Sequence, residues 1–176
     1  MIVIQMTGMS GAGKSSIAEA TRNKLVQEGY SVEILDGDEY RLNLCSDLGF
    51  SKEDRNENIK RLGFVAKILA RNGTIAIIAA INPYEELRKG ITASWHNVKT
   101  VYIKCPIPVL KDRDTKRLYY RASLPKGHPD KVNNLTGISD PFENPNEVGL
   151  VLNTDIETVE ESANRLEKFI KNNISL

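Results

Sequence analysis

The chain has 176 residues, 40% of them hydrophobic, and its 24 lysines and arginines balance 23 acidic residues to a net charge of +1. This length allows one α/β domain over residues 1–176 and is too short for two domains of ordinary size. The balanced charge gives no indication of a nucleic-acid partner or of binding to an anionic membrane. No apolar run approaches the roughly 20 residues that span a bilayer.

Two cysteines, Cys45 and Cys105, lack the spacing of a disulfide framework or a metal site. The first residues lack the basic region and long apolar stretch of a signal peptide. We therefore expect a cytoplasmic protein with reduced thiols.

The chain begins with an apolar run at residues 2–6 that is typical of a buried strand, and residues 16–28 read as a helix. Between them residues 8–15, G-M-S-G-A-G-K-S, fit the phosphate-loop pattern G-x-x-x-x-G-K-[ST] in the strand–loop–helix context that it requires. Backbone N–H groups and Lys14 can bind phosphates there, and Ser15 can ligate Mg²⁺. The alternative is a glycine-rich turn without a ligand. The predicted ATP-binding residues are Gly8, Ser10, Gly11, Ala12, Gly13, Lys14, Ser15 and Ser16.

Strands and helices then alternate along the chain. We predict strands at residues 31–35, 74–81, 98–104 and 150–152, and helices at 51–71, 85–93, 106–113 and 158–172. Residues 114–145 lose this periodicity and contain four prolines, which predicts a long irregular segment that is either functional or disordered.

Alternating strands and helices favour a parallel five-stranded sheet with helices on both faces. Ligands of such sheets bind at the carboxyl ends of the strands. This rule brings the phosphate loop, residues 36–38 and residues 81–83 to one crevice.

The central apolar strand ends without a carboxylate, so an acid that binds the metal has to come from elsewhere. Asp36 and Asp38 follow the second strand and suit this role, an arrangement more typical of small-molecule kinases than of motor ATPases. The absence of an N-K-x-D sequence weakens a GTPase interpretation. D-G is also a common turn dipeptide, so residues 36–38 could simply form a turn.

Arg41, Arg55 and Asn58 follow within about twenty residues of Asp38, and guanidinium groups suit bidentate recognition of phosphate or sulfate. Residues 111–131 hold seven lysines and arginines against three aspartates. Both features favour an anionic acceptor, although single arginines and basic runs are also common on solvated faces.

Two further stretches carry a family resemblance. Residues 47–61 read D-L-G-F-S-K-E-D-R-N-E-N-I-K-R, and residues 135–143 read L-T-G-I-S-D-P-F-E. Together with the phosphate loop and the D-G-D turn, they make nearly the whole chain resemble the adenylylsulfate kinase (APS kinase) family of P-loop kinases. The resemblance implies a three-layer P-loop NTPase fold with a mobile lid over about residues 114–145. It also implies that ATP, with Mg²⁺, phosphorylates the 3′-hydroxyl of adenosine 5′-phosphosulfate (APS) to give PAPS and ADP for sulfate assimilation.

The resemblance also assigns roles to individual residues. Asp38 and Lys14 are expected to be catalytic, Arg113 to contact the ATP base, and Ser15, Asp36 and Asp38 to hold the metal. Phe50 and Leu135 are expected to enclose the acceptor adenine. The remaining acceptor contacts implied by the family are Arg41, Arg55, Asn58, Ile81, Asn82, Lys116, Asn134, Thr136 and Gly137. A homodimer and a sulfate adenylyltransferase partner are further expectations.

Three positions depart from the common family pattern. Asn82 stands where a serine is frequent, which excludes a phosphoserine there and favours direct transfer. Leu135 replaces the usual aromatic residue, and the lid is a few residues longer, with Lys116-Arg117 in place of Lys-Gly. Two other functions remain open from the residues alone: a kinase of the same fold for another small anionic acceptor, and a regulatory module that binds nucleotide without turnover.

Overall fold

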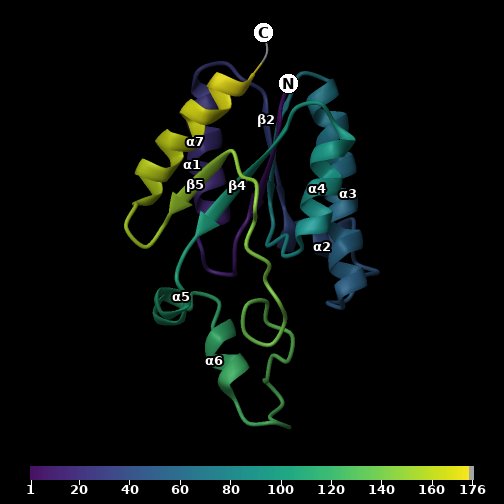
Figure 1. Ribbon diagram of the computed structural model, residues 1–176, viewed down its shortest axis with the longest axis vertical. Coiled ribbons are helices and arrows are strands. Elements are labelled where there is room, and N and C mark those ends of the chain that lie inside the picture. Colours follow the sequence, from purple (N-terminus) through teal and green to yellow (C-terminus); the bar gives the residue numbers. More distant parts are fainter. Residues whose placement is uncertain (175–176) are drawn as a thin grey trace.

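A parallel sheet of five strands forms the centre of the computed structural model, which describes residues 1–174. The strand order is β2-β3-β1-β4-β5, so the strand that precedes the phosphate loop is central (Figure 1). The parallel five-stranded sheet predicted from the alternation of elements is therefore confirmed. The strands are β1 (Val3–Thr7), β2 (Val32–Asp36), β3 (Ile75–Ala79), β4 (Val98–Lys104) and β5 (Leu150–Asn153).

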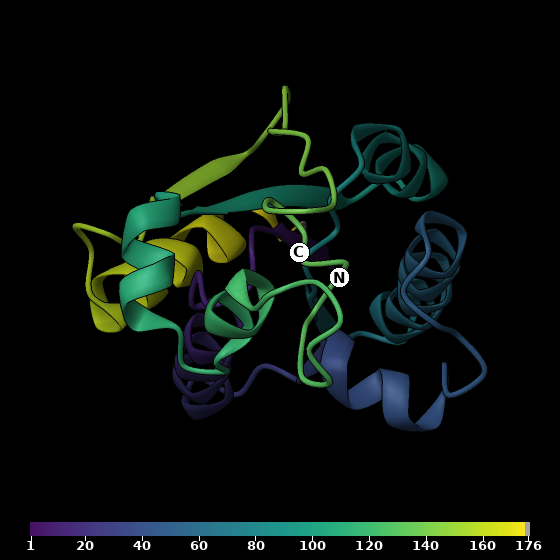
Figure 2. The same cartoon turned by 90° about the horizontal axis from the view of Figure 1, so that it is seen from below.

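Helices cover both faces of the sheet (Figures 1 and 2). α1 (Lys14–Gln27) and α7 (Val159–Asn173) pack together on one face, whereas α3 (Lys52–Arg71) and α4 (Glu85–Ser94) cover the other. Every residue of β1 and β3 is buried, as expected for parallel strands that pack against helices on both sides. The sheet therefore separates two hydrophobic clusters and holds the carboxyl ends of its strands in a rigid row.

Local sequence explains where the long helices begin. The hydroxyl of Ser51 accepts a hydrogen bond from the backbone N–H of Asp54 at the start of α3, and Thr158 and Glu161 form a reciprocal capping box at the start of α7. α1 begins at Lys14, two residues earlier than predicted, because Gly13 adopts a left-handed conformation (φ 100°) and leads the loop directly into the helix.

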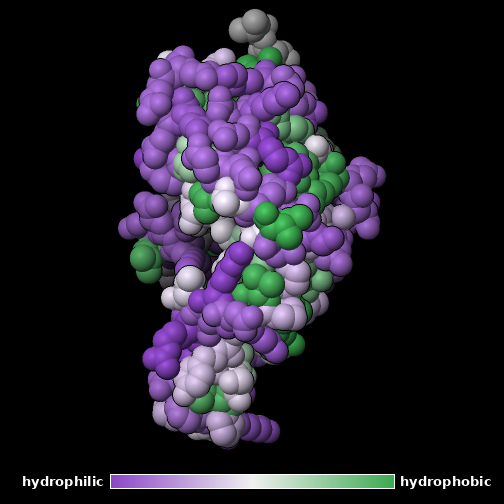
Figure 3. All heavy atoms as spheres, turned by 90° about the vertical axis from the view of Figure 1, so that its left-hand side faces the viewer, coloured by the Kyte–Doolittle hydropathy of each residue, from purple (hydrophilic) through white to green (hydrophobic). Residues whose placement is uncertain are grey.

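Two short helices correct the sequence prediction. α2 (Gly37–Asn43) follows β2 immediately, and α6 (Leu118–Ser123) lies inside the segment that was expected to be irregular throughout. α5 (Ile107–Arg113) agrees with its prediction. The segment of residues 114–145 extends below the sheet in Figure 1, and Figure 3 shows a narrow projection below the main body. Among the described residues, no helix is both long and apolar enough to cross a membrane.

Candidate active site

A cleft of about 800 Å³ lies beside the carboxyl ends of the strands. The register of β2 and β3 aligns Asp36 with Ala79, and the backbone N–H of Gly8 donates to the carbonyl oxygen of Ile81 at 3.2 Å. The phosphate loop, residues 36–38 and residues 81–83 therefore line one cleft, as the strand-end rule predicted. Part of the 114–145 segment forms another wall of it.

The phosphate loop is held close to the sheet. A Cβ atom on Gly8 would lie 2.5 Å from the carbonyl oxygen of Ile103, so only glycine allows this approach. The ammonium group of Lys14 donates to the carbonyl oxygens of Gly8 and Met9, each at 2.9 Å. Burial lowers the pKa of Lys14 to about 8, although the nearby carboxylate of Asp38 opposes this effect. The loop thus holds a buried cation against its own carbonyl groups, where a phosphate would compete for it.

Asp36 joins the phosphate loop to the end of β2. Its Oδ2 atom accepts a 2.6 Å hydrogen bond from the hydroxyl of Ser15, and its Oδ1 atom accepts from the N–H of Asp38 at 2.9 Å, capping α2. A Cβ atom on Gly37 would lie 2.9 Å from the Cβ of Ala80, so glycine allows the start of α2 to pack closely against the chain that follows β3. A hydroxyl and a carboxylate are the hard oxygen donors that Mg²⁺ prefers.

Asp38 and Lys116 meet across the cleft. Asp38 lies in the first turn of α2, and its Oδ2 atom forms an ion pair with the ammonium group of Lys116 from the 114–145 segment. Both side chains are largely exposed, so solvent screens the pair and its net stabilisation is small. The lysine can therefore exchange the carboxylate for an incoming anion at little cost.

Two arginines contact the ring of Phe50, which is 54% exposed and lines the cleft. The guanidinium carbon of Arg41 lies 4.7 Å from the ring centroid, and that of Arg55 lies 5.7 Å away. Arg55 also donates to the carbonyl oxygen of Asn134 at 2.6 Å and pairs with Asp140 at 3.2 Å. This side of the cleft therefore combines an accessible aromatic ring with two cations.

The structure places Leu135 differently from Phe50. Leu135 is only 4% exposed and packs in the hydrophobic cluster on the α1 side of the sheet, although it also contributes to the cleft wall. Leu135 offers little surface to a ligand ring. Phe50 and Leu135 therefore do not present two comparably exposed side chains to the two sides of an aromatic ring.

All but four of the predicted site residues line the cleft. The exceptions are Gly8, Ala12, Arg113 and Gly137. Ala12 is fully buried, and Gly137 lies against Met9, whose sulfur would be 2.4 Å from an added Cβ atom. Arg113 donates to the carbonyl oxygen of Thr154 and contacts the sulfur of Cys105 at 3.7 Å.

The sequence prediction missed several residues of the 114–145 segment, of which Arg121, Lys131 and Tyr119 make polar contributions. Arg121 and Lys131 line the cleft, and the basic run of residues 111–131 was the signal that could have identified them. Tyr119 donates from its hydroxyl to the carbonyl oxygen of Ser10 at 2.8 Å, and burial raises the pKa of Tyr119 to about 12. This tyrosine attaches α6 to the phosphate loop, a long-range contact that no local pattern indicates.

Three buried polar atoms in residues of the cleft wall have no hydrogen-bond partner within the described chain: Oδ1 of Asn58, Oδ1 of Asn82 and Oγ1 of Thr136. Buried polar atoms nearly always have partners in native proteins. A ligand or ordered water in the cleft would therefore complete these bonds.

Comparisons with known proteins agree on one family. Residues 1–153 match the family model described as adenylylsulphate kinase. An adenylyl-sulfate kinase from Microcystis aeruginosa is 47% identical over 161 residues, which cover 92% of this chain and 86% of that protein. A protein from Sorangium cellulosum named probable bifunctional SAT/APS kinase 2 is 46% identical, and the match covers 91% of this chain and 27% of that protein.

A solved structure shows the same fold. The APS kinase CysC of Mycobacterium tuberculosis, in complex with AMPPNP and APS, superimposes with a TM-score of 0.89 at 33% identity, and the match covers 97% of each chain. The phosphate loop after a central strand and the helices on both sheet faces are those of a P-loop NTPase fold. With these matches, the chain belongs to the adenylylsulphate kinase family.

Proposed function

We propose that the protein transfers the γ-phosphoryl group of ATP to the 3′-hydroxyl of adenosine 5′-phosphosulfate, giving PAPS and ADP. The observation that carries this proposal is that one cleft is lined both by the phosphate-loop residues Lys14 and Ser15 and by Phe50, Arg41 and Arg55. The first group suits a nucleoside triphosphate, and the second suits an acceptor that has both an aromatic base and negative charge.

The phosphate loop binds ATP. Backbone N–H groups of Gly11, Gly13 and Lys14, which line the cleft, bind the phosphates. Lys14 leaves the carbonyl oxygens of Gly8 and Met9 to bind the outer phosphates. Arg113, at the end of α5, is assigned to the ATP base by the family resemblance, and its bond to Thr154 places it beside the carboxyl end of β5.

The hydroxyl of Ser15 and the carboxylate of Asp36 fit Mg²⁺, because they are hard oxygen donors already 2.6 Å apart, and Asp38 follows two residues later in the first turn of α2. Among residues 1–174 there is no group of three or more acidic, histidine or cysteine side chains that forms a metal cage. This is the usual situation for Mg²⁺ bound chiefly by phosphates and water. Mg²⁺ supplies charge neutralisation on the phosphates when it is bound.

Asp38 accepts the proton of the acceptor hydroxyl. The 3′-oxygen forms a bond to the γ-phosphorus while the bond from that phosphorus to the bridging oxygen of ADP breaks, and the proton passes to the carboxylate. Lys116 then exchanges its partner Asp38 for the transferring phosphoryl group, whose charge it stabilises together with Lys14. Transfer is direct, because Asn82 has no hydroxyl to carry a phosphoryl group.

The acceptor lies on the other side of the cleft. The exposed ring of Phe50 stacks on its adenine, and Arg41 and Arg55 bind its phosphosulfate. The unpartnered polar atoms of Asn58, Asn82 and Thr136 add hydrogen bonds. Ile81, Asn134 and Leu135 line the same cleft and complete this acceptor region. Gly137, which the family resemblance also assigns to it, lies outside the cleft lining against Met9.

Residues 1–176 act as one domain, of which residues 175 and 176 lie outside the described part of the chain, and the 114–145 segment is a lid that closes over both nucleotides and excludes water. We further infer a cytoplasmic homodimer that works beside a sulfate adenylyltransferase. The match to a protein whose name combines SAT and APS kinase supports that partner.

The test is formation of 3′-phosphorylated product from ATP, APS and Mg²⁺ by the purified protein, with Asp38→Asn and Lys14→Ala assayed in parallel. Product from the wild type that disappears in both variants supports the proposal. Bound ATP without PAPS, together with turnover of another hydroxylated anion, would overturn the choice of acceptor.

A further inference from the structure

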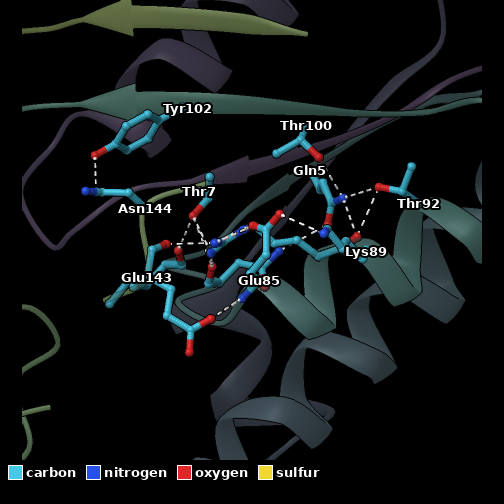
Figure 4. A network of polar contacts seen from close by, with 12 residues as sticks. Gln5, Thr7, Glu85, Lys89, Thr92, Thr100, Tyr102, Glu143 and Asn144 are labelled. Carbon is cyan, nitrogen blue, oxygen red and sulfur yellow. Dashed lines mark hydrogen bonds and ion pairs between the residues drawn. The ribbon is translucent and has the colours of Figure 1, made fainter. Parts of the chain in front are cut away.

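Arg88 is an unusual residue of α4 because its side chain is only 2% exposed. Arginine is almost never fully buried unless it is paired. Its Nε and Nη2 atoms donate to Oε2 of Glu85, at 3.0 Å and 2.7 Å. Figure 4 shows the polar network that includes Glu85 and Glu143. Arg88 is not among the described residues that line the cleft, so the mechanism above gives it no task.

The remaining donors of Arg88 join two segments that are distant in sequence. Nη1 donates to the carbonyl oxygen of Asn82 at 2.7 Å, and Nη2 donates to the carbonyl oxygen of Glu143 at 2.7 Å. Asn82 lines the cleft in a left-handed conformation (φ 45°), which is uncommon for non-glycine residues although asparagine tolerates it better than most. Glu143 lies near the end of the 114–145 segment. The planar guanidinium group therefore fixes a wall of the cleft and the end of the lid at the same time.

Glu143 is attached to the same turn by two further bonds. Its backbone N–H donates to the carbonyl oxygen of Pro83 at 2.9 Å, and its carboxylate accepts from the N–H of Glu85 at 2.7 Å. The N-cap residue of α4, Tyr84, makes no side-chain capping bond, so Glu143 supplies the cap from outside the helix. The end of the lid segment thus completes the amino terminus of α4, as the labelled side chains of Figure 4 show.

Gln5 in β1 sets the orientation of the Asn82 amide. The Nε2 atom of Gln5 lies within hydrogen-bonding distance of the carbonyl oxygen of Arg88 (3.0 Å) and of the hydroxyls of Thr92 (2.8 Å) and Thr100 (2.9 Å), and its two hydrogens can donate to two of these oxygens at a time. A carbonyl oxygen only accepts, so the Oε1 atom of Gln5 faces Asn82 and accepts from its Nδ2 atom at 3.1 Å. This leaves Oδ1 of Asn82 as the buried atom without a partner in the described chain, available to a donor in the cleft.

We propose that Arg88, with Glu85 and Glu143, is a positioning unit that holds the Asn82 turn and the end of the lid segment in a fixed relation, so that the acceptor is aligned for transfer. The proposal rests on the function proposed above. Arg88 itself does not contact substrate: it acts through the carbonyl oxygens of Asn82 and Glu143. Its loss is therefore expected to affect the acceptor and to leave ATP binding largely unchanged.

The experiment compares Arg88→Met, Arg88→Lys and Glu143→Ala with a matched control, Arg165→Met. Arg165 also pairs with a carboxylate, that of Glu157, and donates to a backbone carbonyl oxygen, that of Val151 at 3.0 Å, but outside the cleft lining. For each protein we would measure kcat/KM for APS, Kd for the ATP analogue AMPPNP in the absence of APS, Tm, and hydrogen exchange of the Glu143 amide in the ligand-free state.

We expect Arg88→Met to lower kcat/KM for APS by about 10²-fold, the size of effect that follows a misplacement of about 1 Å. Kd for AMPPNP should stay within about twofold, since the interaction lost is not one with ATP. The Glu143 amide should exchange faster. Arg88→Lys should recover Tm, because it retains the charge opposite Glu85. It should not recover kcat/KM, because a single nitrogen atom on a shorter side chain cannot replace Nη1 and Nη2, which hold the carbonyl oxygens of Asn82 and Glu143 separately. Glu143→Ala should resemble Arg88→Met, and Arg165→Met should leave kcat/KM for APS unchanged.

The proposal is overturned by a folded Arg88→Met protein with wild-type kcat/KM for APS, or by equal losses for APS and AMPPNP. If Arg88→Met does not fold, Glu143→Ala decides, and wild-type kcat/KM for APS in that variant overturns the proposal. A wild-type protein that forms no product from APS would instead refute the proposed function. In that case, hydrogen exchange of the Glu143 amide in the ligand-free wild type and Arg88→Met would still show whether Arg88 holds the end of the 114–145 segment.

Discussion

The hydroxyl of Ser15 donates a 2.6 Å hydrogen bond to Oδ2 of Asp36, which joins the phosphate loop to the end of β2 before any ligand is bound. Because Oδ1 of the same carboxylate caps α2, the orientation of the pair is fixed from both sides. The two oxygens that are proposed to hold Mg²⁺ are therefore already close together.

Asp36→Asn should raise the Mg²⁺ concentration for half-maximal activity by about 10- to 100-fold, the range seen when a partner of a metal site is removed. An amide can still accept from the backbone at the start of α2, so Tm should change little. The measurement is a Mg²⁺ titration of PAPS formation. Asp112→Asn, an exposed aspartate on α5, is the matched control, and an identical Mg²⁺ dependence in both variants would contradict the metal assignment.

Asp38→Asn should lower kcat for APS phosphorylation by about 10²- to 10⁴-fold, the range for loss of a general base. The side chain is largely exposed and its ion pair with Lys116 is screened, so the fold should not depend on it. The check is kcat together with Kd for AMPPNP, which should be unchanged. A variant that retains kcat within about tenfold would show that Asp38 is not the base.

Much of the fold follows from local patterns, because the apolar strand, the glycine-rich loop and the capped helices each have a signal within a few residues. The gathering of Asp36 and Asn82 at one cleft follows from the rule for parallel strands. The two missed helices are short. α2 begins at a D-G pair that also fits a turn, and α6 has an N-cap residue, Arg117, with φ 52°.

Tertiary contacts explain what the sequence could not show. α6 is attached through the bond of Tyr119 to Ser10, and the burial of Leu135 depends on the packing of distant elements. Arg88 looks like a surface residue of an amphipathic helix until Glu143, 55 residues later in the chain, is seen to contact it. The Arg88 network therefore requires the structure.

Phe50 and Leu135 should respond to truncation in opposite ways. Phe50→Ala should raise KM for APS with little change in Tm, because the ring is 54% exposed and its role is stacking. Loss of a base–aromatic stack costs about 1–3 kcal/mol, which corresponds to roughly 5- to 150-fold in KM. Leu135→Ala should lower the free energy of unfolding by about 2–5 kcal/mol, because the side chain is buried in the core.

Steady-state kinetics and chemical denaturation of both variants test this contrast, and each variant serves as the control for the other. A Leu135→Ala protein of unchanged stability with a raised KM for APS would show that Leu135 acts as a face of the adenine site.

The buried ammonium group of Lys14 should take up a proton when ATP binds in alkaline solution. Burial lowers the pKa of Lys14 to about 8 in the ligand-free protein, so the side chain is charged well below that pH and mostly neutral above it. Bound phosphates favour the charged form and raise this pKa again. At about pH 8.5 binding of MgATP should therefore take up close to 0.75 proton, and at about pH 6.5 it should take up almost none.

Calorimetry in two buffers of different ionisation enthalpy measures the proton uptake. Equal binding heats in both buffers at the higher pH would mean that Lys14 keeps its proton in the empty loop, and that its bonds to the carbonyl oxygens of Gly8 and Met9 outweigh the cost of burial.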